Sequence, residues 1–315
     1  MMTKVQGSPE RVLEDALKAK STAPSTLIKR ANSVMLFVDW GRSRGAEDEQ
    51  LIPFREETVY DYLNFCADER AAPTKAPQFL EVVHLTQTKL GLVPMEEGPH
   101  IAGSARRSLN RKAPRVQQAP LSALEVLELE DMVLDEECPL RDRLLAGFAT
   151  FALHTRTRVG DAAKISQEPS LDVPASGAGF IETPTLRHKS RNSKAARAGP
   201  LQVVGSSLGV SGRAWARAWL ELRAFHGHNA DDDGCLQMGL DRDGRSLKRR
   251  ITTTELGTWL SRMVQRLTGP LGRRSLGGHS LKATLLSWAA KAGVQEEHRL
   301  ALGGTSCLLY TSPSP

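Results

Sequence analysis

The most informative part of the chain is the stretch His279-Ser280-Leu281-Lys282-Ala283-Thr284-Leu285-Leu286-Ser287-Trp288-Ala289-Ala290-Lys291-Ala292-Gly293. Its apolar residues recur at helical spacing, which predicts an amphipathic helix that ends at Gly293. His279 and Lys282 stand one helical turn apart at its start, where His279 is either a functional group or a helix cap. The tripeptide Leu302-Gly303-Gly304 then predicts a corner.

A second polar motif is Thr155-Arg156-Thr157-Arg158-Val159-Gly160-Asp161-Ala162-Ala163-Lys164-Ile165. It follows a segment from Leu140 to His154 that is predicted to be a helix with an apolar core face. Arg158 and Asp161 are three residues apart, a spacing that by itself is typical of a surface salt bridge. The position of this motif upstream of the His279 helix favours a functional pair.

Residues typical of β-strands occur only from about Gly179 to Leu186 and from Leu201 to Val204, with a polar basic turn between them. The lysines of this turn include Lys189 and Lys194. A solvated basic loop explains the same residues. The remainder of the second half is predicted to be helical, so this half is expected to be mainly α with a small sheet.

The first half of the chain is predicted to be a compact bundle of four short helices, which are expected near Thr26, Glu56, Pro77 and Ala102. The polar, proline-bounded stretch that follows has no periodicity and is typical of a linker. We expect a disordered segment at 1–23, a helical domain at 24–112, a linker at 113–119 and a second domain at 120–304. Ser122 and Glu125 form a capping box that opens the second domain.

The composition fits a nucleic-acid partner without requiring one. Lys and Arg number 42 against 36 Asp and Glu, and the pI is about 9.2. The cations cluster at 106–115, 187–197 and 242–250, where a solvated surface is the alternative explanation of any one cluster. The four cysteines are scattered, which argues against a disulfide framework. No apolar run approaches the roughly 20 residues of a membrane span, so we expect an intracellular protein that does not cross a membrane.

The two motifs, taken in order, resemble the signature boxes of the tyrosine recombinases, the phage-integrase family. In that family the first box has the form T-G-x-R-x-x-E/D, and the second begins with a histidine followed three residues later by a cation. The resemblance implies a SAM-like helical core-binding domain and an α+β catalytic domain. It also implies that DNA is cut and rejoined through a 3′-phosphotyrosyl intermediate, with no metal or nucleotide cofactor.

The resemblance assigns a role to each candidate catalytic residue. Arg158 would contact the scissile phosphate, and Asp161 would support the site. Lys189 would act as general acid from the hairpin, with Lys194 as the alternate. His279 would hydrogen-bond the phosphate or assist proton transfer. Lys282 stands where the family usually has its second arginine, which retains the charge but loses the bidentate geometry.

The same resemblance implies that the partner is double-stranded DNA and that four copies of the chain bind it as a homo-tetramer. The residues expected to bind DNA are Arg106, Arg107, Arg111, Lys112, Arg187, Arg191 and Lys194. The form of the two motifs suggests that the gene belongs to a mobile element. The protein would then act in the nucleus of a eukaryote or in the cytoplasm of a bacterium.

The nucleophile is not identified in this chain. The family expects a tyrosine farther beyond Gly304 than Tyr310 lies, so we expect Tyr310 not to be the nucleophile. The residues from Cys307 to Ser312 are those that a sequencing-library adapter would encode. The sequence therefore suggests that 305–315 is an adapter-derived tail on a gene cut off near Gly304.

Two other functions remain as alternatives. One is a catalytically degenerate DNA-binding protein of the same fold, for which Lys282 is the marker, and the other is a helical interaction protein with no DNA partner. ATP use is not indicated, because the chain has no G-x-x-x-x-G-K-S/T loop. A metal site is not indicated either. The polar group His226, His228, Asp231, Asp232, Asp233 and Cys235 has no regular ligand spacing and is explained by a solvated loop.

Overall fold

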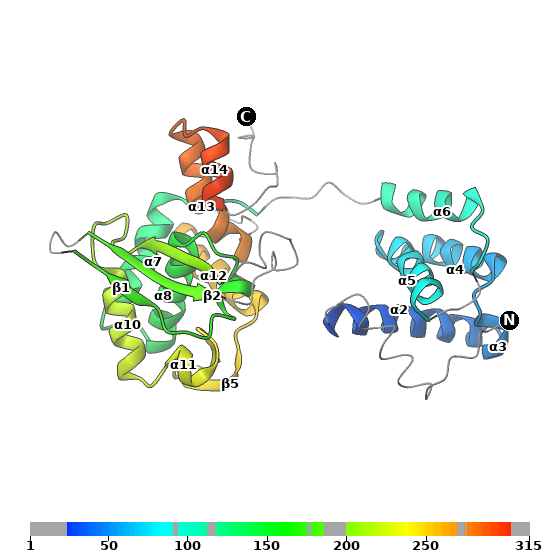
Figure 1. The fold of residues 1–315 in the computed structure, drawn as a ribbon, viewed down its shortest axis with the longest axis horizontal. Coiled ribbons are helices and arrows are strands. Elements are labelled where there is room, and N and C mark those ends of the chain that lie inside the picture. The colour runs from blue at the N-terminus through cyan, green and yellow to red at the C-terminus, as the bar shows by residue number, and fades with distance from the viewer. Residues whose placement is uncertain are drawn as a thin grey trace. The chain divides into compact units, whose positions relative to one another are not determined.

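The structure is a computed structural model that describes residues 24–90, 94–111, 118–174, 178–185, 200–269, 274 and 276–303. The chain divides into two compact units, Met1–Arg115 and Val116–Pro315 (Figure 1). Each unit has its own hydrophobic core. The predicted fold class is confirmed, since the described elements are mostly helices with two small antiparallel sheets.

The N-terminal unit is helical throughout its described elements. These are α2 (Pro24–Ser43), α3 (Asp48–Leu51), α4 (Glu56–Asp68), α5 (Lys75–Leu90) and α6 (Pro99–Asn110). Its core is aromatic: the ring of Phe37 packs against those of Trp40, Phe54, Tyr62 and Phe79. The four predicted helices are present, and α3 is an addition that the sequence reading missed because it is a single turn.

The C-terminal unit is built around α8, whose residues from Leu144 to His154 are all buried. Its helices are α7 (Ala123–Leu134), α8 (Leu140–His154), α9 (Val159–Ala162), α10 (Trp215–Phe225), α11 (Ala230–Asp233), α12 (Thr253–Thr268), α13 (Gly278–Lys291) and α14 (Glu296–Gly303). Ser122 caps α7 through the predicted capping box with Glu125. Gly147 lets the ring of Trp219 lie directly on α8, because a Cβ there would overlap the indole.

Two antiparallel sheets complete this unit. The first contains β1 (Ser170–Asp172), β2 (Phe180–Thr185) and β3 (Leu201–Ser206) in that order, and the second pairs β4 (Met238–Leu240) with β5 (Ser246–Arg250). The predicted hairpin is present as β2 and β3, which pair from Phe180↔Ser206 to Thr185↔Leu201.

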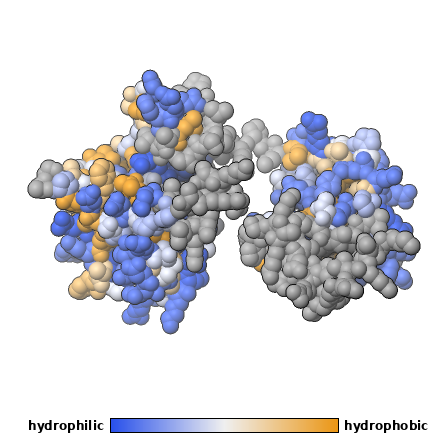
Figure 2. All heavy atoms as spheres, in the orientation of Figure 1, coloured by the Kyte–Doolittle hydropathy of each residue, from blue (hydrophilic) through white to orange (hydrophobic). Residues whose placement is uncertain are grey.

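The expectation that strands occur only in this hairpin was wrong for β1, β4 and β5. β1 and β4 have three residues each, and β5 is basic and exposed, so none shows the apolar alternation by which strands are recognised. The surface near β5 is accordingly hydrophilic (Figure 2). Among the described residues, no helix has both the length and the apolar character needed to cross a membrane.

Candidate functional site

The first motif forms the corner that ends α8. Arg156 N–H donates to Leu153 O at 3.1 Å and Thr157 N–H to Ala152 O at 3.0 Å, the paired bonds of a Schellman motif. This motif needs a left-handed residue, and Arg156 takes that conformation with φ of 55°. A non-glycine residue in that region costs about 1–2 kcal/mol.

Arg158 and Asp161 lie together, immediately after the corner. Arg158 is the N-cap residue of α9, and its Nη1 lies 3.9 Å from Asp161 Oδ2. The Arg158 side chain is 33% exposed, whereas that of Asp161 is 12% exposed. The carboxylate is therefore the more buried partner of this ion pair, and the guanidinium is the partner that solvent can reach.

The second motif reaches the same corner through the first turn of α13. A Cβ on Gly278 would lie 2.8 Å from Thr253 Cγ2 and 3.0 Å from Val159 Cγ2. The missing side chain therefore allows α13 to pack closely on α9 and on the start of α12. Arg158 and His279, the chain neighbours of Val159 and Gly278, flank this contact.

His279 and Lys282 occupy different environments although they are one turn apart. The side chain of His279 is exposed, and its backbone N–H donates to Gln118 Oε1 at 3.1 Å. Lys282 is only 4% exposed. The N-cap position of α13 belongs to Gly277, so the alternative reading of His279 as the cap is not what the structure shows.

The environment of Lys282 changes its acidity. Burial lowers the pKa of its ammonium group, the positive charge of Arg158 lowers it further, and that of Arg156 does the same. Asp161 acts in the opposite direction, and the resulting pKa is about 8. These four residues, Arg156, Arg158, Asp161 and Lys282, are called the corner cluster below.

The corner cluster combines three basic side chains with one carboxylate in a partly buried position. Positive charge held away from water favours a bound anion, and guanidinium groups match the oxygens of a phosphate with two parallel hydrogen bonds. The described geometry is thus suited to hold a phosphate group.

Arg156 is the member of the corner cluster that sequence reasoning missed. The family pattern T-G-x-R has glycine at this position, which suits the left-handed corner. The arginine in this chain departs from that pattern, and its left-handed backbone conformation is less favourable than it would be for glycine. Arg156 Nη2 donates to Val204 O on β3 at 3.4 Å, a contact that the sequence alone does not indicate.

The remaining candidates divide into two groups. Lys112, Arg187, Lys189, Arg191, Lys194 and Tyr310 lie outside the described residues. Arg106, Arg107 and Arg111 are exposed on or just after α6 in the N-terminal unit. Arg107 Nη2 donates to Asn64 Oδ1 at 2.8 Å and Arg111 Nη1 to Ala67 O at 2.9 Å, so both also fasten α6 to α4.

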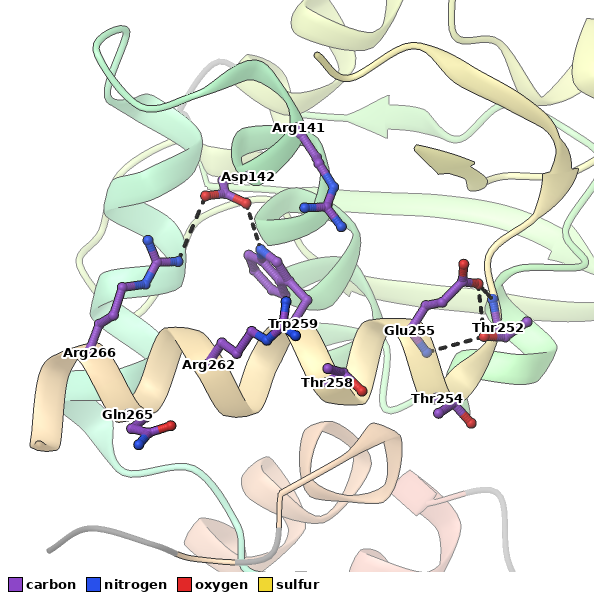
Figure 3. A pocket seen from close by; sticks show the side chains of 10 residues that line it. All are labelled: Arg141, Asp142, Thr252, Thr254, Glu255, Thr258, Trp259, Arg262, Gln265 and Arg266. Atoms are coloured by element: carbon purple, nitrogen blue, oxygen red, sulfur yellow. Dashed lines mark hydrogen bonds and ion pairs between the residues drawn. The ribbon is translucent and has the colours of Figure 1, made fainter. Parts of the chain in front are cut away.

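A hollow of about 660 Å³ lies between the start of α8 and one face of α12 (Figure 3). It is lined by Arg141, Asp142, Thr252, Thr254, Glu255, Thr258, Trp259, Arg262, Gln265 and Arg266. Asp142 lies between two side chains of α12: it accepts from Trp259 Nε1 at 2.8 Å and approaches Arg266 Nη2 at 3.7 Å. These contacts fasten α12 to α8 and so hold the helix whose first turn supports Gly278.

No protein-family model matches the sequence, and no curated protein matches it. Solved structures do match. A lambda integrase dimer bound to a COC′ core site has 15% identity and a TM-score of 0.54, with 97% of this chain and 94% of that chain covered. XerH recombinase bound to its difH substrate has 13% identity and a TM-score of 0.57, with 98% and 81% covered.

The Tn1549 transposon integrase in complex with transposon right end DNA has 9% identity and a TM-score of 0.54, with 97% of this chain and 93% of that chain covered. Identities this low establish the fold alone. The chain has the fold of the tyrosine recombinases, the family that its two motifs resemble.

Proposed function

We propose that this protein is a site-specific DNA recombinase that acts through a 3′-phosphotyrosyl intermediate. The observation that carries the proposal is the corner cluster, in which two motifs more than a hundred residues apart place Arg158, Asp161 and Lys282 in one electrostatic environment. Several solved structures that this chain resembles are DNA complexes, among them a lambda integrase tetramer on a Holliday junction. We infer duplex DNA as the partner and an oligomer on DNA as the working form.

The chemistry requires positive charge where a pentacoordinate phosphorus develops negative oxygens. Arg158 supplies a guanidinium that cannot lose its proton, and Asp161 would help to orient it through their ion pair. His279 is exposed at the edge of the same contact and would hydrogen-bond a phosphate oxygen. Lys189 remains the proposed general acid for the departing 5′ oxygen.

The basic residues of α6 are proposed to bind the far side of the duplex. Arg107 and Arg111 each bond within the unit, but a guanidinium has five N–H donors, so donors remain for phosphate oxygens. Such contacts contribute affinity and salt dependence instead of sequence choice.

Binding of a fluorescent duplex over a range of salt concentrations tests the DNA partner. We expect the logarithm of the association constant to fall linearly with the logarithm of the salt concentration. The slope should become shallower by about 0.9 when Arg158→Gln removes one phosphate contact. An exposed arginine on α10 provides the control, Arg217→Gln, which should leave the slope unchanged. Weak binding that is insensitive to salt would favour the helical interaction protein instead.

The role of Tyr310 is tested on a nicked suicide duplex. The chain contains three tyrosines, of which Tyr60 and Tyr62 belong to α4 in the N-terminal unit. We expect the chain to bind this duplex without covalent attachment on a denaturing gel. A covalent complex that is lost in Tyr310→Phe would show that Tyr310 is the nucleophile after all.

The second candidate function is a catalytically degenerate DNA-binding protein, which a buried lysine at the position of the expected arginine favours. Sequencing the source locus past the Gly304 codon separates the two functions. A downstream His or Trp followed by a tyrosine supports the recombinase, and a chain that includes them should attach covalently to the suicide duplex. A chain that has them but only shifts the duplex in a native gel would be a binding protein.

A further inference from the structure

We propose that Arg156 is a second phosphate-binding guanidinium of the corner cluster and takes the part that the sequence resemblance assigns to an arginine at position 282. The inference rests on the proposed function, because it names a further residue that binds the DNA phosphate. It does not follow from the family pattern, which has glycine where this chain has Arg156.

The first step is the position of Arg156. It occupies the left-handed residue of the α8 corner, with φ of 55°, a conformation that glycine adopts without steric cost. An arginine here fixes the start of its side chain between the end of α8 and Arg158. The side chains of Arg156 and Arg158 therefore start two residues apart in the same turn.

The second step is the electrostatic contact between Arg156 and the rest of the cluster. The charge of Arg156 acts on Lys282 in the same sense as that of Arg158, so both guanidinium groups lie close enough to repel that ammonium group. Burial lowers the pKa of Arg156 itself, so its charge is partly removed from water. An anion bound between these cations would offset both effects.

The third step is the orientation and exposure of these groups. Arg156 Nη2 donates to the carbonyl oxygen of Val204 at 3.4 Å, which ties the guanidinium to β3. Arg156 and Arg158 are both partly exposed, whereas Lys282 is 4% exposed. A phosphate that approaches the corner therefore meets two planar forks first, with the lysine as a point charge beneath them.

A purely structural role makes a different prediction. If Arg156 served only to join the corner to β3, its removal would lower stability and leave DNA affinity unchanged. If it binds phosphate, its removal lowers affinity and the salt dependence of binding. Glycine is the most informative replacement, because it suits φ of 55° and removes only the guanidinium and its stem.

The experiment measures binding of a fluorescent duplex to the whole chain over a range of salt concentrations, together with thermal unfolding. We expect Arg156→Gly to unfold at or above the wild-type temperature, to bind DNA about tenfold more weakly and to lose about 0.9 from the salt slope. Arg217→Gln, on the exposed face of α10, is the control and should retain both the affinity and the salt slope of the wild type. Adding Lys282→Arg to Arg156→Gly should restore most of the affinity, because it returns a second guanidinium to the cluster.

Wild-type affinity and slope in Arg156→Gly, with weakened binding in Arg158→Gln, would overturn this inference and leave the proposed function standing. Binding by the wild type that is weak and insensitive to salt would overturn the proposed function. If Arg156→Gly unfolds early, Arg156→Met keeps the aliphatic stem and takes its place, and the same two outcomes decide.

Discussion

At the scale of single residues, Lys282 shows how an environment changes the meaning of a substitution. In sequence, a lysine in place of an arginine retains the charge. In the structure, burial and two neighbouring guanidinium groups bring the pKa of Lys282 to about 8, while Asp161 opposes this change. The charge that an arginine would hold at any pH becomes, in this chain, one that is lost just above neutrality.

The first prediction concerns pH. In the free protein Lys282 is protonated below about pH 8 and loses its proton above it, whereas an ordinary lysine titrates near 10.5. Phosphate favours the protonated form, so affinity for duplex DNA should fall as pH rises from about 7 to 9, by at most about tenfold per pH unit for one linked proton. Anisotropy titrations at several pH values measure this.

Two variants serve as comparisons for this pH effect. Lys282→Arg should flatten the profile, because the new group keeps its proton throughout. Lys291→Arg, an exposed position on the same helix, should retain the wild-type profile. An unchanged profile in Lys282→Arg would show that another group controls the pH dependence.

At the scale of elements, the loop between β3 and α10 is anchored by one buried carboxylate. Glu130 of α7 accepts hydrogen bonds from Val210 N at 2.7 Å, from Ser211 N at 3.0 Å and from Ser211 Oγ at 2.8 Å. Burial would raise the pKa of Glu130, but the bonds from His154 and from this loop together lower it. Gly209 makes the approach possible, since a Cβ there would overlap the carboxylate.

The second prediction is that Glu130→Gln lowers the free energy of unfolding by about 1–3 kcal/mol near neutral pH. Because the pKa of Glu130 in the folded protein lies below the ordinary glutamate value of 4.5, the carboxylate contributes its full stability above pH 4.5. It loses this contribution as the pH falls through the folded-state pKa. The difference between wild type and variant should therefore shrink in acid. Urea unfolding at neutral and acidic pH measures it.

An exposed carboxylate provides the control for this prediction. Glu136→Gln, in the turn after α7, should change stability by less than about 0.5 kcal/mol. Equal stability of Glu130→Gln and wild type at neutral pH would mean that the loop does not depend on this carboxylate.

At the scale of the whole molecule, the two cores have no buried residue in common. The N-terminal core is centred on Phe37, Tyr62 and Leu63, and the C-terminal core on α8 and its neighbours. Two separate hydrophobic cores in one chain are typical of domains that unfold separately. We propose that the boundary lies in the linker expected at 113–119, and the division into Met1–Arg115 and Val116–Pro315 supports this.

The third prediction follows from the separate cores. Calorimetry should show two transitions, and Leu63→Ala, which empties a fully buried position, should lower only one of them. The expected loss is about 2–5 kcal/mol in the N-terminal unit. Leu260→Ala, at an equally buried position of α12, should lower the other transition. A single transition that moves with both substitutions would show that the units unfold together.

Local chemistry explains what could be predicted from sequence. The start of α7 could be predicted because the capping interaction of Ser122 involves Glu125, only three positions away. The helices α8 and α13 could be predicted for the same reason, because the spacing of their apolar residues is a local pattern. β4 was not, because its three residues owe their conformation to a partner strand.

The sequence by itself determined the mainly helical fold, the central hairpin and the two motifs whose order resembles a recombinase. Only the tertiary structure decided that Arg156 shares the environment of Lys282, that Lys282 is buried and that His279 stays exposed. The physical reason is distance along the chain. Helix caps and periodicity arise from neighbours within a few residues, whereas the burial and pKa of a side chain depend on α9, α12, α13 and β3 meeting at one corner.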